Sequence, residues 1–246
     1  MTEKNPERRS LFYPEVLRFL VEREAEGDLI ATERKVELLK ISEYVTAKRR
    51  SGDSVRLTFI CTHNSRRSHL SQVWAQVAAD YFGLSAIQTF SGGTEATAMN
   101  PRAVAALRAA GLQIDADDEQ SGNPRYRVRV SASLPSQECF SKVFNAAPNP
   151  AENYCAIMTC SHADENCPVA MGCDLRVAVR YEDPKEADGT PMEADRYQER
   201  SRQICREMLW LMNTSPRNQP CRELFPRDND VESAEWRVLN WIQSGR

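Results

Sequence analysis

The sequence predicts an α/β fold in which helices flank a parallel sheet. Short apolar, β-rich runs alternate with helical patterns between residues 57 and 110, an order typical of parallel strands joined by helical crossovers. A further apolar run at 155–159 indicates another buried strand, and a long amphipathic helix is expected at 191–212. No internal repeat is visible.

The overall composition limits the classes of function. The chain has 246 residues, enough for one large domain or a core with additions. Its 32 Lys and Arg against 35 Asp and Glu give a formal net charge of −3, so charge provides no case for a nucleic acid or an anionic membrane as partner. No basic-then-apolar leader is present, and no apolar run approaches the ~20 residues that span a bilayer. We therefore expect a soluble, cytoplasmic protein.

Residues 1–54 are expected to form a helical N-terminal extension. Apolar residues recur at helical spacing within 14–26 and again within 32–49, and Gly27-Asp28 separates the two patterns. The preferred interpretation is a helical pair packed on the core. The alternative is a surface for dimerisation or for a partner.

The first strand of the core, at 57–60, runs into a polar loop at 61–67. A helix is expected from Ser68 to Phe82, because apolar residues recur there at helical spacing and Gly83 follows as a stop. A loop between a strand and a helix N-terminus is a site for an anion, since the loop N–H groups can converge and the helix adds positive potential.

Three side chains of this loop fit such a site. Arg67 offers a planar fork that matches a tetrahedral oxyanion. The same positive field favours the thiolate of Cys61, to which Ser68 can donate a hydrogen bond, while Asn64 can brace the loop. The competing interpretation is a buried cysteine followed by surface arginines. The strand before the loop and the helix after it favour the functional interpretation.

The alternation continues after the loop helix. A strand is expected at 86–91, and Asn100 caps a helix from Pro101 to Ala110 with Gly111 as its stop. Residues 112–150 are an irregular, proline-marked insertion with a weak strand pattern at 126–130.

The last third of the chain is predicted less sharply. A weaker strand is expected at 174–181, before the helix at 191–212. Residues 214–230 are rich in proline and polar residues, and 231–242 could form a short helix.

The segment CTHNSRRS, residues 61–68, follows the pattern C-x5-R-S. It resembles the phosphate loop of the low-molecular-weight tyrosine phosphatase superfamily, which includes the thioredoxin-coupled arsenate reductases. Residues 91–114 also resemble the family, and are closer to the reductase branch than to the eukaryotic phosphatases. The resemblance implies a four-stranded parallel sheet at residues 55–213, with helical additions at 1–54 and 214–246.

The resemblance also implies roles for the loop residues. Cys61 would be the nucleophile, and Arg67 and Ser68 would act with it. The oxyanion, arsenate or a phosphate-type group, would be held by Thr62, His63, Asn64, Ser65, Arg66 and Arg67. No cofactor and no metal ion is expected.

A pair of cysteines follows the strand at 155–159. Cys160 and Cys167 enclose six polar residues, and Pro168 comes next. Loops at the carboxyl ends of neighbouring parallel strands gather in one crevice, so Cys160 could lie near Cys61. The segment resembles the redox segment of the thioredoxin-coupled arsenate reductases. This implies that Cys160 and Cys167 form a disulfide shuttle reduced by thioredoxin or a similar dithiol.

Two other interpretations of these cysteines stay open. One is inert thiols buried in the core. The other is a zinc site, although the spacing fits no compact CxxC pair. Its ligands would come from Cys155, Cys160, His162, Cys167 and Cys173.

Asp183-Pro184 follows the two cysteine motifs in the order of the family. Family members place a general acid in such a pair, facing the phosphate loop, so Asp183 would protonate the departing oxygen. Tyrosine phosphatases usually carry aromatic residues beside this acid, whereas here Lys185 and Glu186 follow and Tyr181 is the only nearby aromatic. This departure favours a small inorganic oxyanion over a phosphotyrosine.

Two further positions depart from the family. Arg66 stands where many members carry a second cysteine or an apolar residue. Gln72 replaces an acidic residue that the reductases use near a bound cation, which argues against a potassium site. Of the histidines, His63 is interpreted as a solvent-facing spacer and His69 as a surface residue of the helix.

Together the motifs predict an arsenate reductase with a nucleophilic cysteine and a two-cysteine shuttle. The first alternative is a phosphatase that hydrolyses phosphotyrosine or another phosphomonoester through a phosphocysteine intermediate. The second, from a different class, is an oxyanion-binding module with negligible turnover.

Overall fold

The computed structural model describes residues 6–161, 163 and 170–215. His162, Cys167 and the helix expected at 231–242 lie outside these residues, so the predictions made for them remain predictions.

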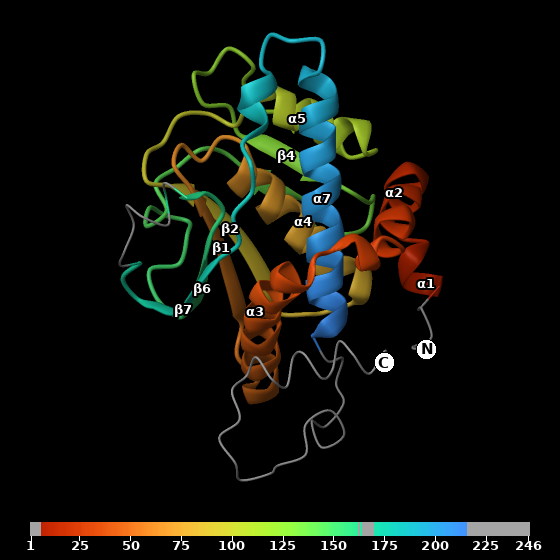
Figure 1. Cartoon of the computed structure of the whole chain (residues 1–246), viewed down its shortest axis with the longest axis vertical. Helices are drawn as coiled ribbons and strands as arrows, with labels where there is room; N and C mark the ends of the chain where they lie inside the picture. Colours follow the sequence, from red (N-terminus) through yellow and green to blue (C-terminus); the bar gives the residue numbers. More distant parts are fainter. Residues whose placement is uncertain (1–5, 162, 164–169, 216–246) are drawn as a thin grey trace.

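Four parallel strands form the central sheet (Figure 1). Their spatial order is β2 (Ile87–Gly93), β1 (Val55–Cys61), β6 (Tyr154–Met158) and β7 (Cys173–Ala178). Each neighbouring pair is parallel. The predicted α/β fold with a four-stranded parallel sheet is confirmed. Every residue of β6 is buried, which explains its continuous apolar run.

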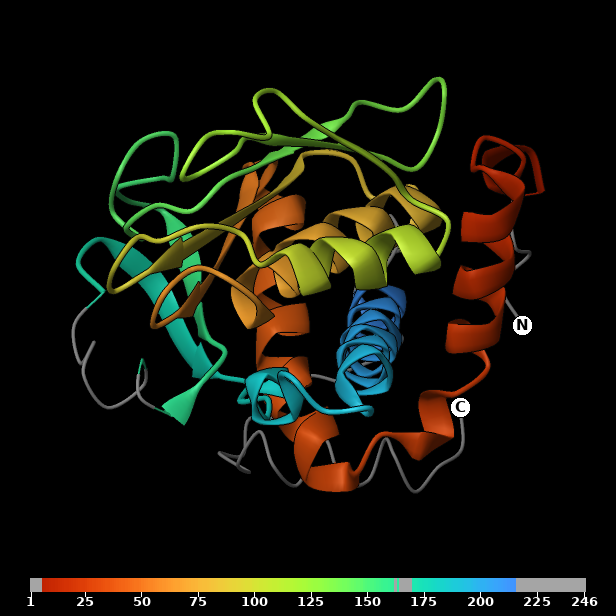
Figure 2. The ribbon, with the colours of Figure 1, turned by 90° about the horizontal axis from the view of Figure 1, so that it is seen from above.

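Helices pack around a long C-terminal helix, α7 (Glu193–Thr214), which Figure 2 shows nearly end-on. The helices in contact with it are α2 (Pro14–Glu24), α3 (Thr32–Ser51), α4 (Arg67–Phe82) and α5 (Pro101–Ala109). The indole N–H of Trp74 in α4 donates to the Ser201 hydroxyl of α7 over 2.9 Å. Phe19 of α2 stacks on the same Trp74.

Helix boundaries follow the expected capping residues. The Asn100 side chain accepts a hydrogen bond from the Arg102 N–H at the start of α5. Gly83 has a φ of 70° at the end of α4, the left-handed conformation that glycine adopts without strain. Three short helical elements are also present: α1 (Pro6–Arg9), the 3-10 turn η1 (Gly27–Leu29) and the 3-10 turn η2 (Pro184–Ala187).

The helices of the N-terminal region share the core with the rest of the chain. Val16 and Leu20 of α2, and Leu38 and Ile41 of α3, are fully buried in the same apolar cluster as Trp74. This packing agrees with a helical pair on the core. The domain boundaries at residues 54 and 213 stay a prediction.

The two faces of the sheet bury different sets of side chains. Leu57 and Phe59 of β1 join the helix-facing cluster, whereas Ile60 and Cys61 belong to a smaller cluster on the other face. Side chains alternate along a strand, and β1 follows this rule as far as Ile60, whereas Cys61 joins the same cluster as Ile60. Cys160 lies in the same smaller cluster as Cys61.

The insertion at 112–150 holds a second sheet that the sequence only partly indicates. Its antiparallel strands are β3 (Gln113–Ala116), β4 (Tyr126–Arg129) and β5 (Gln137–Cys139). Only β4 falls on the weak pattern at 126–130. The others have three or four residues, which is too short for an alternation to stand out.

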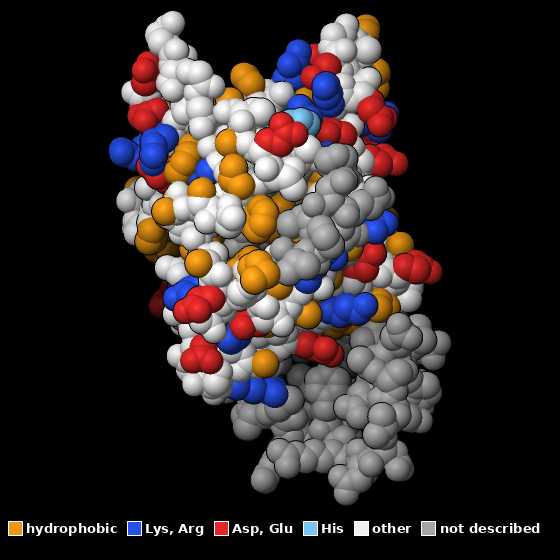
Figure 3. Space-filling model, turned by 90° about the vertical axis from the view of Figure 1, so that its left-hand side faces the viewer, with side chains coloured by type: hydrophobic (Ala, Val, Ile, Leu, Met, Phe, Trp, Pro, Cys, Tyr) orange, Lys and Arg blue, Asp and Glu red, His pale blue; other side chains and the backbone are white. Residues whose placement is uncertain are grey.

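No helix among the residues described is long and apolar enough to cross a bilayer. The face shown in Figure 3, on the side of the molecule where β7 lies, intersperses acidic, basic and apolar side chains.

Candidate active site

The loop between β1 and α4 surrounds the sulfur of Cys61. Cys61 is buried at the end of β1, and its Sγ lies 3.1 Å from the Ser68 Oγ. The Asn64 side-chain amide donates to the same Ser68 oxygen over 2.9 Å. Since that oxygen already accepts from Asn64, the Ser68 hydroxyl hydrogen can point at the sulfur. This arrangement stabilises a negative charge on Cys61.

Asn64 has the bracing contacts that the sequence predicts. It is fully buried and has a φ of 44°, a conformation that asparagine tolerates better than most residues. Its side-chain carbonyl accepts the backbone N–H of Lys142 over 2.9 Å. The insertion therefore fixes the loop from outside.

Backbone carbonyls of the loop are tied to the surrounding chain. Those of Cys61, Thr62, His63 and Ser65 accept hydrogen bonds from Thr94, Glu95, Ser141 and Asn100 respectively. A loop whose carbonyls are held outward can keep its N–H groups for a ligand inside it. The local geometry thus supports the predicted anion site.

Gly93 is the point where β2 touches this loop. A Cβ at residue 93 would lie 2.6 Å from the Thr62 carbonyl oxygen and 2.7 Å from the Asn64 nitrogen. Replacing Gly93 by alanine must therefore displace loop backbone, with an expected loss of about 1–3 kcal/mol in the free energy of unfolding and weaker oxyanion binding. Urea denaturation and phosphate titration would measure both. Gly122→Ala is the matched control, because no atom lies within 4 Å of its added Cβ.

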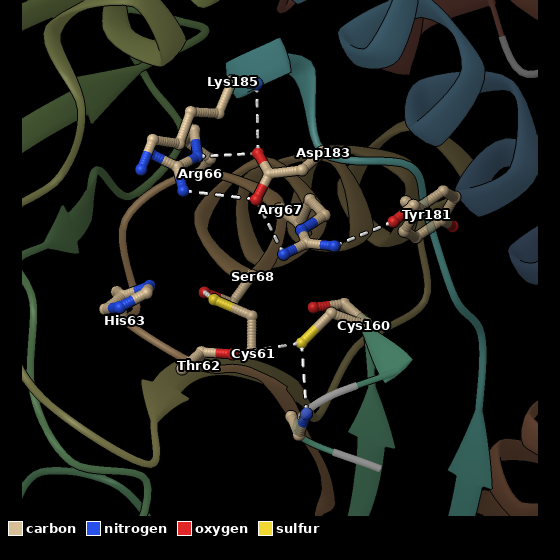
Figure 4. Close-up of polar contacts among 12 residues, drawn as sticks. Cys61, Thr62, His63, Arg66, Arg67, Ser68, Cys160, Tyr181, Asp183 and Lys185 are labelled. Carbon is tan, nitrogen blue, oxygen red and sulfur yellow. Dashed lines mark hydrogen bonds and ion pairs between the residues drawn. The ribbon is translucent and has the colours of Figure 1, made fainter. Parts of the chain in front are cut away.

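Arg67 and Asp183 lie together over the loop (Figure 4). Arg67 Nη1 donates to the Tyr181 carbonyl over 2.9 Å, and Nη2 donates to Asp183 Oδ2 over 2.8 Å. The third donor of the fork, Nε, is buried and has no partner among the described residues. A buried donor without a partner is costly, so this nitrogen is a ready contact for an oxyanion.

Asp183 is held by a second arginine. Arg66 Nε lies 2.8 Å from Asp183 Oδ1, and Arg66 Nη2 lies 3.2 Å from Oδ2. Burial of Asp183 disfavours its carboxylate, but Arg67 and Arg66 outweigh this and hold the pKa of Asp183 below its ordinary value. The predicted general acid is therefore ionised in this arrangement.

Cys160 lies at the same edge of the sheet as Cys61. The Thr159 N–H donates to the Ile60 carbonyl over 2.7 Å, so the chain after β6 continues alongside the end of β1. The Cys160 Sγ lies 3.6 Å from the Thr62 Oγ1 and accepts the Ala163 N–H over 3.3 Å. Figure 4 shows both sulfurs at the loop.

Three other described cysteines are buried thiols. Burial raises the pKa of the Cys139 thiol to about 12, and it also raises the pKa of the Cys155 and Cys205 thiols. Such thiols are poor nucleophiles. Within the described part of the chain, no three His, Cys, Asp or Glu residues gather as a metal site would require. His162 and Cys167 fall outside it.

The prediction for His69 is wrong. His69 is fully buried, its Nδ1 lies 3.2 Å from the Ser91 Oγ, and burial lowers its pKa to about 3. Helix α4 is covered by the sheet and by α7, so its apolar pattern understates how much of it is enclosed. His63, in contrast, has a side chain 46% exposed, with Nε2 3.9 Å from the Glu95 carboxylate. It faces solvent as expected.

The sequence does not predict a contact that the N-terminal region makes with residues 180 and 181. Arg34 of α3 lies over the Tyr181 ring at 5.2 Å and donates to the Arg180 carbonyl. The Tyr181 hydroxyl in turn donates to Glu207 over 2.8 Å. Buried in this way, Tyr181 cannot stack on a substrate ring. Its carbonyl instead receives Arg67, so α3 supports the segment that carries Asp183.

Comparison with known proteins gives two kinds of match. The family described as low molecular weight phosphotyrosine protein phosphatase matches residues 56–125. The chain is 28% identical over 135 residues to an arsenate reductase of Halalkalibacterium halodurans, covering 55% of this chain and 78% of that one. It is 32% identical over 126 residues to an arsenate reductase of Brevibacillus brevis, covering 51% and 74%.

Solved structures also align with the chain at low identity. A YwlE mutant from Bacillus subtilis aligns at 15% identity and a TM-score of 0.41, covering 65% of this chain and 97% of that one. A low molecular weight phosphotyrosine phosphatase from Vibrio cholerae O395 aligns at 13% identity and a TM-score of 0.42, covering 66% and 96%. On the family match and the identity to the Brevibacillus protein, the chain belongs to the low-molecular-weight phosphotyrosine protein phosphatase family of cysteine-based enzymes.

Proposed function

We propose that this protein is an arsenate reductase in which Cys61 is the nucleophile and Cys160 and Cys167 form the disulfide shuttle. The observation that carries the proposal is the position of Cys160, whose sulfur contacts Thr62 inside the loop that surrounds Cys61. A phosphatase has no need of a second thiol at this point. The relatives named arsenate reductase support the same assignment.

In the first step, arsenate binds in the loop against its backbone N–H groups and Arg67. The Cys61 thiolate attacks arsenic, and an arsenic–oxygen bond breaks as that oxygen leaves as water. Asp183 is the candidate proton donor, since its carboxylate lies over the loop beside Arg67. Because the oxyanion competes with Asp183 for Arg67, binding weakens one of the two ion pairs that keep Asp183 ionised.

In the second step, the Cys160 thiolate attacks the sulfur of Cys61. A sulfur–sulfur bond forms, and the electron pair of the sulfur–arsenic bond stays on arsenic, which leaves as arsenite. Neighbouring parallel strands lie ~4.8 Å apart, and disulfide-bonded Cα atoms are about 4.4–6.8 Å apart. Since Cys160 directly follows Thr159, which pairs with the end of β1, the bond needs only a local shift of the chain.

The third step returns Cys61 to the thiolate. Cys167 attacks Cys160, so that the disulfide moves to the Cys160–Cys167 pair and Cys61 is released. Thioredoxin, or a dithiol of similar reactivity, would then reduce this bond. Such a cycle requires a compartment that keeps thiols reduced, so we place it in the cytoplasm.

Replacing Cys160 by serine separates reduction from hydrolysis. The variant should reduce arsenate no faster than the background rate, because no thiol attacks the Cys61 adduct. It should keep p-nitrophenyl phosphate hydrolysis, which uses Cys61 and water but no second thiol. Coupled thioredoxin turnover and p-nitrophenol release measure the two. Cys173→Ser is the matched control, since Cys173 is a partly exposed thiol outside the loop.

Thiol mass mapping after one arsenate turnover tests the shuttle directly. A Cys160–Cys167 disulfide is expected in the wild-type protein and no disulfide in Cys160→Ser. Wild-type rates of arsenate reduction by the Cys160→Ser protein would contradict the proposal.

A phosphomonoesterase is the second candidate, because Cys61, Arg67 and Asp183 serve either reaction. Phosphate ester turnover without arsenate reduction in the wild-type protein would favour it. If neither substrate turns over with thioredoxin present, an oxyanion-binding module is the better description.

A further inference from the structure

Arg66 makes an ion pair that the reaction above does not use. Its Nε donates to Oδ1 of Asp183 and its Nη2 donates to Oδ2, which is the forked geometry that suits a guanidinium. The Arg66 side chain is 12% exposed and that of Asp183 is 22% exposed. A pair so enclosed is screened little by solvent.

Donors surround the Asp183 carboxylate on all sides. Oδ1 receives Arg66 Nε and the backbone N–H of Lys185, and Oδ2 receives Arg66 Nη2 and Arg67 Nη2. A carboxylate offers about four lone-pair positions, so these four contacts fill them. A proton can join either oxygen only if one of these donors leaves.

Substrate binding does not remove the block. An oxyanion can recruit Arg67, but Arg66 covers both carboxylate oxygens by itself. Asp183 therefore keeps one guanidinium partner when an oxyanion takes Arg67. Its capacity to donate a proton depends on Arg66 more than on Arg67.

We propose that Arg66 is a positioning residue that sets substrate specificity by holding Asp183 as a carboxylate. Phosphomonoester dianions carry no proton, so their leaving oxygen needs one from the enzyme, and this site supplies it poorly. Dihydrogen arsenate carries two protons of its own, so one oxygen can take both and leave as water without a proton from the enzyme. Arg66 thereby favours the oxyanion over the ester. This inference rests on the proposed role of Asp183 as the proton donor.

The test compares two esters that differ in their need for a proton. Phenyl phosphate releases a basic phenoxide that must be protonated, whereas 2,4-dinitrophenyl phosphate releases a stable anion. In Arg66→Leu, kcat/KM for phenyl phosphate should rise about tenfold, while that for the dinitrophenyl ester should change by less than about threefold. Arg66→Lys keeps the charge without the fork, and should fall between Arg66→Leu and the wild type.

Lys185→Met is the matched control. It removes one positive charge two residues from Asp183. The contact of Lys185 with Asp183 is a backbone N–H, which the variant keeps. Both esters should react as with the wild-type protein. Equal changes of the two esters in Arg66→Leu, or an equal gain in Lys185→Met, would overturn the proposal.

Carbon-13 NMR titration of the Asp183 carboxyl, assigned by its loss in Asp183→Asn, gives a readout that needs no turnover. The midpoint should move to higher pH in Arg66→Leu and stay in place in Lys185→Met. An unchanged midpoint in Arg66→Leu overturns the inference. A protein that reduces no arsenate but shows the shifted midpoint and the ester difference would refute the reductase assignment and leave the role of Arg66 standing.

Discussion

Replacing Cys61 by serine is expected to abolish both arsenate reduction and phosphoester hydrolysis. Both reactions begin with attack by the same sulfur, and a serine hydroxyl in its place stays protonated near neutral pH. The loss of kcat should be on the order of 10⁴-fold or more, as for other covalent nucleophiles. Single-turnover arsenate reduction and p-nitrophenyl phosphate hydrolysis are the measurements.

The fold should survive this change, which makes the result interpretable. The new hydroxyl keeps a hydrogen-bond partner, because the Ser68 Oγ lies 3.1 Å from the present sulfur. The free energy of unfolding should change by no more than about 1 kcal/mol. Retention of more than a trace of either activity in a properly folded Cys61→Ser protein would exclude Cys61 as the nucleophile.

The features that the sequence predicts well are local ones. The loop, its cysteine, its arginine and the start of α4 lie within eight consecutive residues, so their relation is visible in the order of residue types alone. The same holds for α5, where Asn100 caps the helix and a positive-φ glycine, Gly111, follows it. Strand, loop and helix each impose a short sequence pattern, and these patterns can be recognised without knowing what the rest of the chain does.

Features that depend on distant pairing are predicted poorly. The helical pattern of α4 suggests a surface position for His69, but His69 is fully buried and its Nδ1 lies 3.2 Å from the Ser91 Oγ of β2. Arg34 donates a hydrogen bond to the carbonyl of Arg180, 146 residues later in the sequence, and no local pattern predicts this contact. The short antiparallel strands of the insertion are stabilised by each other, so none is marked on its own.

Arg66 illustrates the boundary between the two cases. Its position in the loop, and its departure from the family, are plain in the sequence. Its partner is not, because Asp183 lies 117 residues further on. Sequence order places both residues in the site, whereas only the three-dimensional structure shows that they hold each other and what this does to the proton on Asp183.

Replacing Arg67 by alanine is expected to remove most of the affinity for the oxyanion. Its guanidinium supplies the one buried side-chain donor near the loop that lacks a partner among the described residues of the loop and of 181–185. Loss of such a donor to a developing charge typically costs about 10²–10³ in rate. Arsenate reduction should fall by that factor, and the dissociation constant for phosphate should rise.

Arg67→Lys separates charge from shape. Lysine keeps the positive charge but has no planar fork, so it cannot contact the Tyr181 carbonyl, Asp183 and an oxyanion together as three guanidinium nitrogens can. We therefore expect Arg67→Lys to recover only a small part of what Arg67→Ala loses. Isothermal titration with phosphate and steady-state arsenate turnover would show this.

The proper control is an arginine that pairs on the surface. Arg196→Ala removes a half-exposed residue of α7 that pairs with Glu199, and it should change neither quantity. Asp183 stays paired with Arg66 when Arg67 is absent, so the loop is not left with an isolated buried charge and the variants should fold. Unchanged phosphate affinity in folded Arg67→Ala would mean that the loop amides alone hold the anion, and the assignment of Arg67 to substrate binding would be wrong.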